Sequence, residues 1–96
     1  MEFWSVIKYK PKEGCEDKFI EALRVLKNGP NKGERGLRFI QLGTGEIAEI
    51  VNYECLDKMM ELQINGLDWL DSVDHLLERY EDDSRTSAFS GNILDI

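Results

Sequence analysis

The chain is short of the residues that metal sites, disulfide frameworks and membrane spans require. Its 96 residues include two cysteines, one histidine and two prolines. Cys15 and Cys55 match no zinc-ligand spacing and are too few for a disulfide framework, which favours two reduced thiols. No apolar run approaches the roughly 20 residues of a membrane span, and the N-terminus has no signal-peptide pattern. We therefore expect a cytoplasmic protein that binds no membrane.

Positive charge is also scarce. The chain has 12 basic and 19 acidic residues, a net charge of −7. Nucleic acids and anionic membranes attract clustered Lys and Arg, so neither is an expected partner. The length predicts one domain over residues 1–96, which would bury only about 60–65% of the surface of the unfolded chain. Burial against a partner would therefore add considerably to its stability.

Four segments have the β-branched and aromatic composition of strands. They are Phe3–Lys10, Leu37–Leu42, Ile47–Tyr53 and Ala88–Ile96. Gly43–Glu46 predicts a tight turn that joins the second segment to the third. In the third segment, alternation places Ile47 and Val51 on one face and Ala48 and Ile50 on the other. Apolar residues on both faces indicate that both faces are covered.

Three segments have helical periodicity. The clearest is Cys15–Asn28, which has one apolar arc and acidic residues in its first turn. The segment Leu56–Ile64 predicts a short helix that ends at Asn65-Gly66. A further helix is expected over Leu67–Asp82, followed by a loop before the last strand.

The order β-α-β-β-α-β predicts the ferredoxin-like α+β fold. Its four-stranded antiparallel sheet has the spatial order 4-1-3-2, with the helices on one face. Cys15 and Cys55 would then lie at opposite ends of the sheet, roughly 25 Å apart and beyond disulfide reach. The helix-free face still needs a cover, which predicts a homodimer formed through that face.

Two stretches carry a family resemblance. VIKYKPKEGCEDKFIEAL resembles the opening of dimeric α/β-barrel proteins, and IVNYECLDKMMEL resembles their third strand and the helix after it. The resemblance covers nearly the whole chain as a pattern of element lengths and apolar positions. It implies a dimeric α/β barrel similar to the antibiotic-biosynthesis monooxygenases, in a superfamily that also holds haem-degrading proteins, isomerases and decarboxylases. It also implies a ligand cavity between sheet and helices.

Haem and metal chemistry are both disfavoured. A haem-degrading relative implies a helical His facing the cavity, but His75 lies about 155° from the centre of the apolar arc. It also implies an Asn on the first strand, and Phe3–Lys10 has none. Asp71 and Glu78 flank His75 at helical spacing, where surface ion pairs are the ordinary outcome. We therefore expect neither a cofactor nor a metal.

The resemblance to cofactor-independent monooxygenases implies Asn, Trp and Tyr side chains that orient a polycyclic phenol. Candidates for catalysis are Asn52, Trp69 and Tyr53, and candidates for ligand binding are Trp4, Asn52, Trp69 and Tyr80. Tyr9 is a further phenol that could reach a pocket. Each has a structural alternative: a buried Asn must be hydrogen-bonded, and a Trp on an apolar arc usually packs in the core.

Two functions remain open at this point. The first is a small-molecule-binding protein or monooxygenase-like enzyme that acts on an aromatic or apolar substrate. The alternative is a non-catalytic module for ligand sensing or assembly. A pocket lined by Trp69, Asn52 and a tyrosine would favour the first function, and a filled interior would favour the second.

Overall fold

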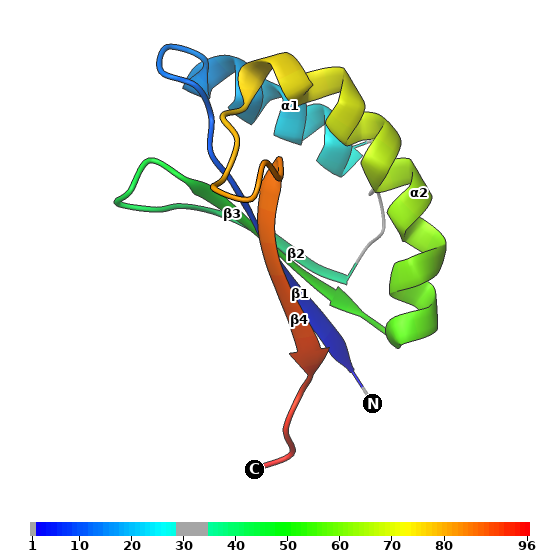
Figure 1. The fold of residues 1–96 in the computed structure, drawn as a ribbon. Helices are drawn as coiled ribbons and strands as arrows, with labels where there is room; N and C mark the ends of the chain where they lie inside the picture. The colour runs from blue at the N-terminus through cyan, green and yellow to red at the C-terminus, as the bar shows by residue number, and fades with distance from the viewer. Residues whose placement is uncertain (1, 29–34) are drawn as a thin grey trace.

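The computed structural model describes residues 2–28 and 35–96. Two α-helices and a short 3₁₀ helix lie on one side of a four-stranded sheet (Figure 1). The elements are β1 (Phe3–Tyr9), α1 (Glu16–Asn28), β2 (Arg35–Gln41), β3 (Ile47–Tyr53), α2 (Leu56–Val73), η1 (Asp74–Leu76) and β4 (Thr86–Asn92). Among the described residues, no helix is both long enough and apolar enough for a membrane crossing.

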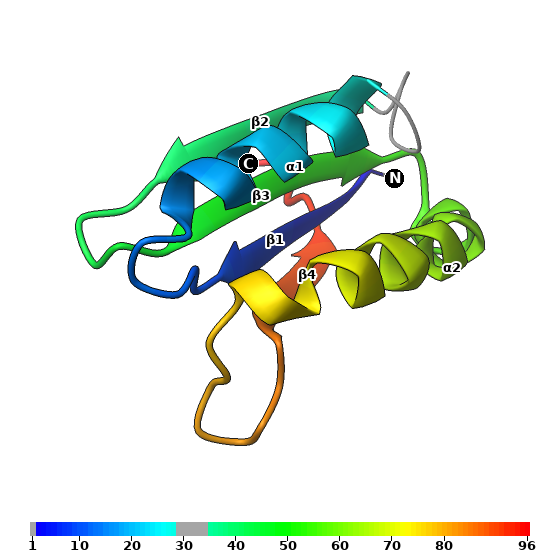
Figure 2. The same cartoon turned by 90° about the horizontal axis from the view of Figure 1, so that it is seen from above.

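The strands pair antiparallel in the order β2-β3-β1-β4, which is the predicted order 4-1-3-2 read from the other edge. The two central strands are thus the two whose sequences are apolar on both faces. Seen from above, α1 lies over the β2 side of the sheet and the second half of α2 lies toward β4 (Figure 2). The predicted α+β ferredoxin-like fold is confirmed.

The turn between β2 and β3 forms where glycine allows it. The backbone N–H of Gly45 donates to the Leu42 carbonyl at 3.1 Å, and the N–H of Leu42 donates to the Glu46 carbonyl at 2.8 Å. Gly45 has a φ of +92°, a left-handed conformation that side chains disfavour. The predicted turn is therefore confirmed, and it sets the register that places the residues of β3 opposite those of β2.

The helix α1 follows its sequence pattern. Glu16 and Asp17 occupy the first turn, and the buried residues are Phe19, Leu23 and Leu26. These three side chains join a core cluster with residues of β1, β3 and the segment after α2. The helix α1 therefore covers part of one face of the sheet with these three side chains.

The predictions for the second helical region need correction. Asn65-Gly66 does not end a helix, because α2 runs without a break from Leu56 to Val73. A glycine inside a helix costs about 1 kcal/mol relative to alanine, which packing elsewhere can offset. The helical segment also stops well before Asp82. After η1, Leu77 pairs with Pro11 in an isolated β-bridge.

This early exit from the helix has a packing reason. Leu76 is 7% exposed and Leu77 is 3% exposed, so two neighbours in sequence are both buried. The Leu76 carbonyl accepts from the N–H of Lys12 at 2.8 Å, and the N–H of Glu78 donates to the Lys10 carbonyl at 2.7 Å. The chain thus closes the end of the core with an extended segment. The last strand is also shorter than predicted, ending at Asn92 rather than Ile96.

Candidate functional site

The two faces of the sheet differ in what they carry. Ile7 and Tyr9 pack in the core against α1 and the α2 region, so alternation turns Ser5 to the same side. In the register with β3, Ser5 lies opposite Val51 and Ile7 lies opposite Glu49. The helix-covered face therefore carries polar groups in the middle of an apolar interior.

The central polar group is the carboxyl of Glu49, which is 3% exposed. The Tyr9 hydroxyl donates to its Oε1 at 2.7 Å. Burial raises the pKa of Glu49, and the hydrogen bond from Tyr9 opposes that rise without cancelling it. A carboxyl held this way can take up or release a proton nearer to neutral pH than a solvated one, which is the property that acid–base catalysis uses. We call these two residues the interior pair.

Aromatic rings position the interior pair. The Tyr9 ring lies 5.1 Å from the Phe19 ring and 5.8 Å from the Trp69 ring, measured between centroids. Phe19 and Trp69 are themselves 5.9 Å apart. The Tyr9–Trp69 contact is edge-on, at 81° between planes, a geometry that aromatic pairs favour. Three rings from β1, α1 and α2 thus fix where the Tyr9 hydroxyl lies.

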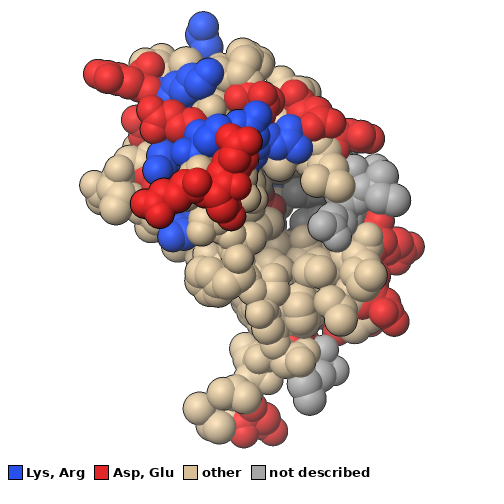
Figure 3. All heavy atoms as spheres, viewed as in Figure 1, with Lys and Arg blue, Asp and Glu red and all other residues tan. Residues whose placement is uncertain are grey.

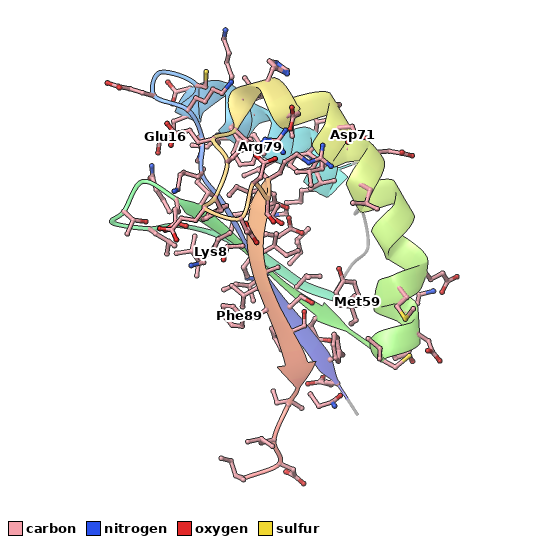
Figure 4. All side chains as sticks on the ribbon, in the orientation of Figure 1. Lys8, Glu16, Met59, Asp71, Arg79 and Phe89 are labelled. Carbon is pink, nitrogen blue, oxygen red and sulfur yellow. The ribbon has the colours of Figure 1, made fainter. Side chains whose placement is uncertain are left out.

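A second polar contact lies further along β1. The Ser5 and Ser90 hydroxyl oxygens are 2.8 Å apart, and Ser5 Oγ also lies 3.5 Å from the sulfur of Met59 on α2 (Figure 4). Ser5 is 3% exposed. These groups satisfy one another, so this contact joins β1, β4 and α2 and leaves Glu49 as the ionisable group of the interior.

A pocket of about 280 Å³ opens between α1 and the β2 edge of the sheet. Its lining residues are Ile20, Leu23, Arg24, Lys27, Phe39, Ile40, Gln41 and Ile47. We call it the α1–β2 pocket. Phe39 lies directly opposite Glu49 in the strand register, and Ile47 precedes Glu49 by two residues on the same face. The floor of the pocket is therefore built by the neighbours of the interior pair.

The residues predicted to form a site do not gather in one place. Trp69 packs against Tyr9 in the interior, and the register puts Tyr53 on the same face at the far end of β3, opposite Phe3. Trp4 and Asn52 lie opposite each other on the helix-free face. None of these four lines the pocket between α1 and β2, the pocket beside β4 or the pocket near the β2–β3 turn, whereas Tyr80 borders the one beside β4.

Trp4 and Asn52 share an unusual feature. Asn52 is 5% exposed, and neither its Oδ1 nor the Trp4 Nε1 has a hydrogen-bond partner in the part of the chain that the structure describes. An unpaired buried polar atom costs about 1–3 kcal/mol. The helix-free face thus carries a donor and an acceptor that the described residues leave unsatisfied.

Tyr80 belongs to a second tyrosine–carboxylate contact, at the edge of the sheet. Its hydroxyl donates to Glu46 Oε2 at 2.6 Å, and Thr44 Oγ1 donates to Glu46 Oε1 at 2.8 Å. These bonds, with Lys8 and Lys10 nearby, lower the pKa of Glu46, and burial followed by the Glu46 contact raises the pKa of Tyr80. We call Tyr80 and Glu46 the edge pair. It ties the β2–β3 turn to the loop before β4.

The helix surface around His75 forms ion pairs. His75 is exposed, as its position on the predicted helix indicates. Asp71 pairs with Arg85 at 2.5 Å, and Arg79 pairs with Asp74 at 2.8 Å. Across residues 2–28 and 35–96, no three His, Cys, Asp or Glu side chains are grouped so as to hold a metal ion.

Sequence reasoning missed Glu49. The signal was present, because Glu49 is the single charged residue of the strand IAEIVNY and shares a face with Ile47 and Val51. A carboxylate at a core position of a central strand must have a partner or a function. Its partner Tyr9 is 40 residues away in sequence. Only the strand register reveals that the two meet.

These features define a ferredoxin-like α+β fold with a hydrogen-bonded tyrosine and carboxyl buried inside it. The chain has the fold of the antibiotic biosynthesis monooxygenase-like proteins. It is similar to Rv0793 from Mycobacterium tuberculosis, with a TM-score of 0.80 and 15% identity over 100% of this chain and 98% of that one. A Nitrosomonas europaea protein, provisionally named an antibiotic biosynthesis monooxygenase, has a TM-score of 0.80 and 13% identity over 98% and 91% of the chains.

A NIPSNAP family protein from Agrobacterium tumefaciens shares the fold as well, with a TM-score of 0.70 and 11% identity over 99% of this chain and 95% of that one. No family model matches the sequence, and no curated protein matches it. Likeness at this level of identity concerns the fold, and function must be argued from the site.

Proposed function

We propose that the protein binds an apolar or aromatic small molecule in the α1–β2 pocket and acts on it as a cofactor-independent monooxygenase-like enzyme. The observation that carries this proposal is the interior pair, a buried carboxyl with a raised pKa beside an apolar pocket. The shared fold with proteins named as monooxygenases supports the reaction class.

In this mechanism Glu49 acts as a general base and Tyr9 holds it in place. A phenolic substrate gives its hydroxyl proton to the Glu49 carboxylate, and the resulting phenolate passes electrons to O₂. One oxygen atom of O₂ enters the ring and the other leaves as water, so that phenol and O₂ yield quinone and water. Trp69 acts as a positioning residue, because its ring packs against Tyr9.

The Glu49→Gln variant tests this role. It keeps the shape and the hydrogen-bond acceptor for Tyr9 but cannot take up a proton. With 1-naphthol as probe and O₂ consumption as readout, we expect kcat to fall by about 10²–10⁴-fold with little change in KM. Glu46→Gln in the edge pair is the matched control and should leave kcat unchanged. Full activity of Glu49→Gln would refute the proposal.

We also propose that two copies associate through the helix-free face, and that the protein is cytoplasmic. Phe89 on β4 is 64% exposed and points away from the helices (Figure 4). Charged side chains gather at the end of the molecule that carries the turns, and the surface over β4 is largely uncharged (Figure 3). The unpaired atoms of Trp4 and Asn52 lie on the same face. Both cysteines are free, as a reducing compartment keeps them.

Sedimentation velocity tests the dimer. We expect a dimer at micromolar concentration, and Phe89→Asp should weaken association at least about tenfold because it places a charge in an apolar interface. Val25→Asp is the matched control, since Val25 is 61% exposed on α1 and away from the sheet. A folded, monodisperse monomer of the unmodified chain would contradict the proposal.

The alternative is a non-catalytic module for ligand sensing or assembly. The packed rings of Tyr9, Phe19 and Trp69 favour it, because they fill the interior around the tryptophan that was expected to line a pocket. Under this alternative the protein binds naphthol without consuming O₂, and Glu49→Gln changes affinity alone.

A further inference from the structure

We propose that the α1–β2 pocket selects an organic anion, an apolar carboxylate whose acidic group lies at Lys27 and whose body lies on Leu23, Phe39 and Ile47. This inference rests on the proposed function, because it concerns the ligand of the same pocket. It adds the chemical class of that ligand.

The lining of the α1–β2 pocket differs in charge from the linings of the pocket beside β4 and the pocket near the β2–β3 turn. It contains two cations and no carboxylate. The pocket beside β4 is lined by Glu81 and Asp82, and the pocket near the β2–β3 turn is lined by four glutamates. In a chain with 19 acidic and 12 basic residues, a pocket free of carboxylates is a local exception. An anion in this pocket therefore meets no carboxylate among the lining residues.

The two cations at the pocket are not equivalent. Arg24 already pairs with Glu21 at 2.7 Å, so part of its charge is neutralised. Lys27 makes no ion pair within the described residues and lies one turn further along the same helix face. The third polar lining group, the Gln41 amide, donates to Glu16. Lys27 is therefore the group with free capacity for a ligand carboxylate.

The rest of the lining favours an apolar body. Leu23 and Ile47 are each 3% exposed, and Phe39 is half-buried. Phe39 is the most exposed of the three, and an apolar carboxylate covers it, whereas a purely inorganic anion would leave it in contact with water. The carboxylate of the ligand would then lie beside Lys27, and its apolar body would lie on Leu23, Phe39 and Ile47.

Paired probes that differ only in charge test this inference. We would titrate 2-naphthoate against 2-naphthamide, and octanoate against octanamide, by calorimetry with the unmodified protein. We expect each carboxylate to bind about two- to fivefold more tightly than its amide, the range of an exposed ion pair. Lys27→Gln should remove this preference and leave amide binding unchanged.

Lys18→Gln is the matched control, because Lys18 is exposed on the same helix, does not line the pocket and makes the same change in net charge. It should keep the preference. Equal binding of carboxylate and amide, or an equal effect of the two lysine variants, would overturn the inference, as would the failure of all four probes to bind. Amide binding that depends on Glu49 without any preference for the carboxylate would refute the anion and leave the proposed function standing.

Discussion

The interior pair and the edge pair are the same contact in two environments. In each, a tyrosine hydroxyl donates to a glutamate, at 2.7 Å from Tyr9 to Glu49 and at 2.6 Å from Tyr80 to Glu46. The two glutamates are three residues apart in the chain. Yet the pKa of Glu49 is raised and the pKa of Glu46 is lowered.

The opposite shifts show whether desolvation or hydrogen bonding has the larger effect on the pKa of each glutamate. Around Glu49 the hydrogen bond from Tyr9 competes with nearly complete burial in an apolar core, and burial dominates. Glu46 accepts from Tyr80 and Thr44 and lies 4.0 Å from Lys8, and these interactions outweigh its desolvation. Identical partners therefore leave the two carboxyl pKa values shifted in opposite directions, and under the proposed function the interior pair is the one that accepts a proton.

The largest effect should come from removing the ring that supports the interior pair. Trp69→Ala leaves Tyr9 without its edge-on neighbour and opens a cavity, so we expect a loss of about 3 kcal/mol in the free energy of unfolding, measured in urea. Activity should fall with it. Trp69→Phe retains a ring and should recover most of both. Unchanged stability of Trp69→Ala would show that the ring packing contributes little.

The two tyrosines should differ when each loses its hydroxyl. Tyr9→Phe leaves a buried carboxyl without its donor and should cost about 1–3 kcal/mol of stability. Tyr80→Phe removes a contact at a more solvated site, where Glu46 keeps Thr44, and should cost less than about 1 kcal/mol. Urea unfolding of both variants measures the difference. Equal losses of stability in the two variants would show that burial does not make the Tyr9 hydrogen bond more important than the Tyr80 hydrogen bond.

The two glutamates should give opposite pH dependences. Glu49 has a raised pKa in the folded state, so the stability it contributes is present below its ordinary pKa and is lost as pH rises through the raised value. Glu49→Gln should therefore gain about 1 kcal/mol relative to the unmodified protein at pH 7 and lose that gain in acid. Glu46 has a lowered pKa, so its contribution is present above its ordinary pKa and is lost as pH falls through the lowered value.

Glu46→Gln should accordingly destabilise the protein at pH 7, by less than about 1 kcal/mol, with the difference disappearing in acid. Unfolding curves of both variants across pH 3–8 give the measurement. Curves of the same sign for the two variants would mean that burial does not separate these carboxyls.

The smallest effect should come from Lys10, a cation beside the edge pair. The Lys10 ammonium lies 4.7 Å from the centre of the Tyr80 ring. Lys10→Met keeps the length of the side chain and removes the charge, so we expect a loss of about 0.5 kcal/mol that shrinks as salt is added. A salt-independent loss would assign the effect to packing instead.

Much of the fold followed from local pattern. The strand and turn signals gave the element order, and the order gave the sheet, because short connections leave few topologies. The second helix was harder. Asn65-Gly66 carries a local stop signal, yet α2 continues through it to Val73. Leu76-Leu77 fits a helical arc, but Leu76 ends a 3₁₀ helix and Leu77 is extended, and both are buried.

The site was predicted less completely for a physical reason. The central strands carry apolar residues on both faces, so alternation divides them into two sets without saying which set the helices cover. Trp4 and Asn52 were grouped with Trp69 as candidates, and the register places them on the opposite side of the sheet. Glu49 was passed over because its partner is remote in sequence.

The sequence by itself determined the strands, the first helix and the turn at Gly45, since each depends on residues close together in the chain. It also determined the order of the sheet, because short connections between the elements leave few topologies. Only the tertiary structure decided which face the helices cover and that Tyr9 meets Glu49 there. It also decided the proton affinities of Glu49 and Glu46, because desolvation depends on everything packed around a group rather than on its neighbours in sequence.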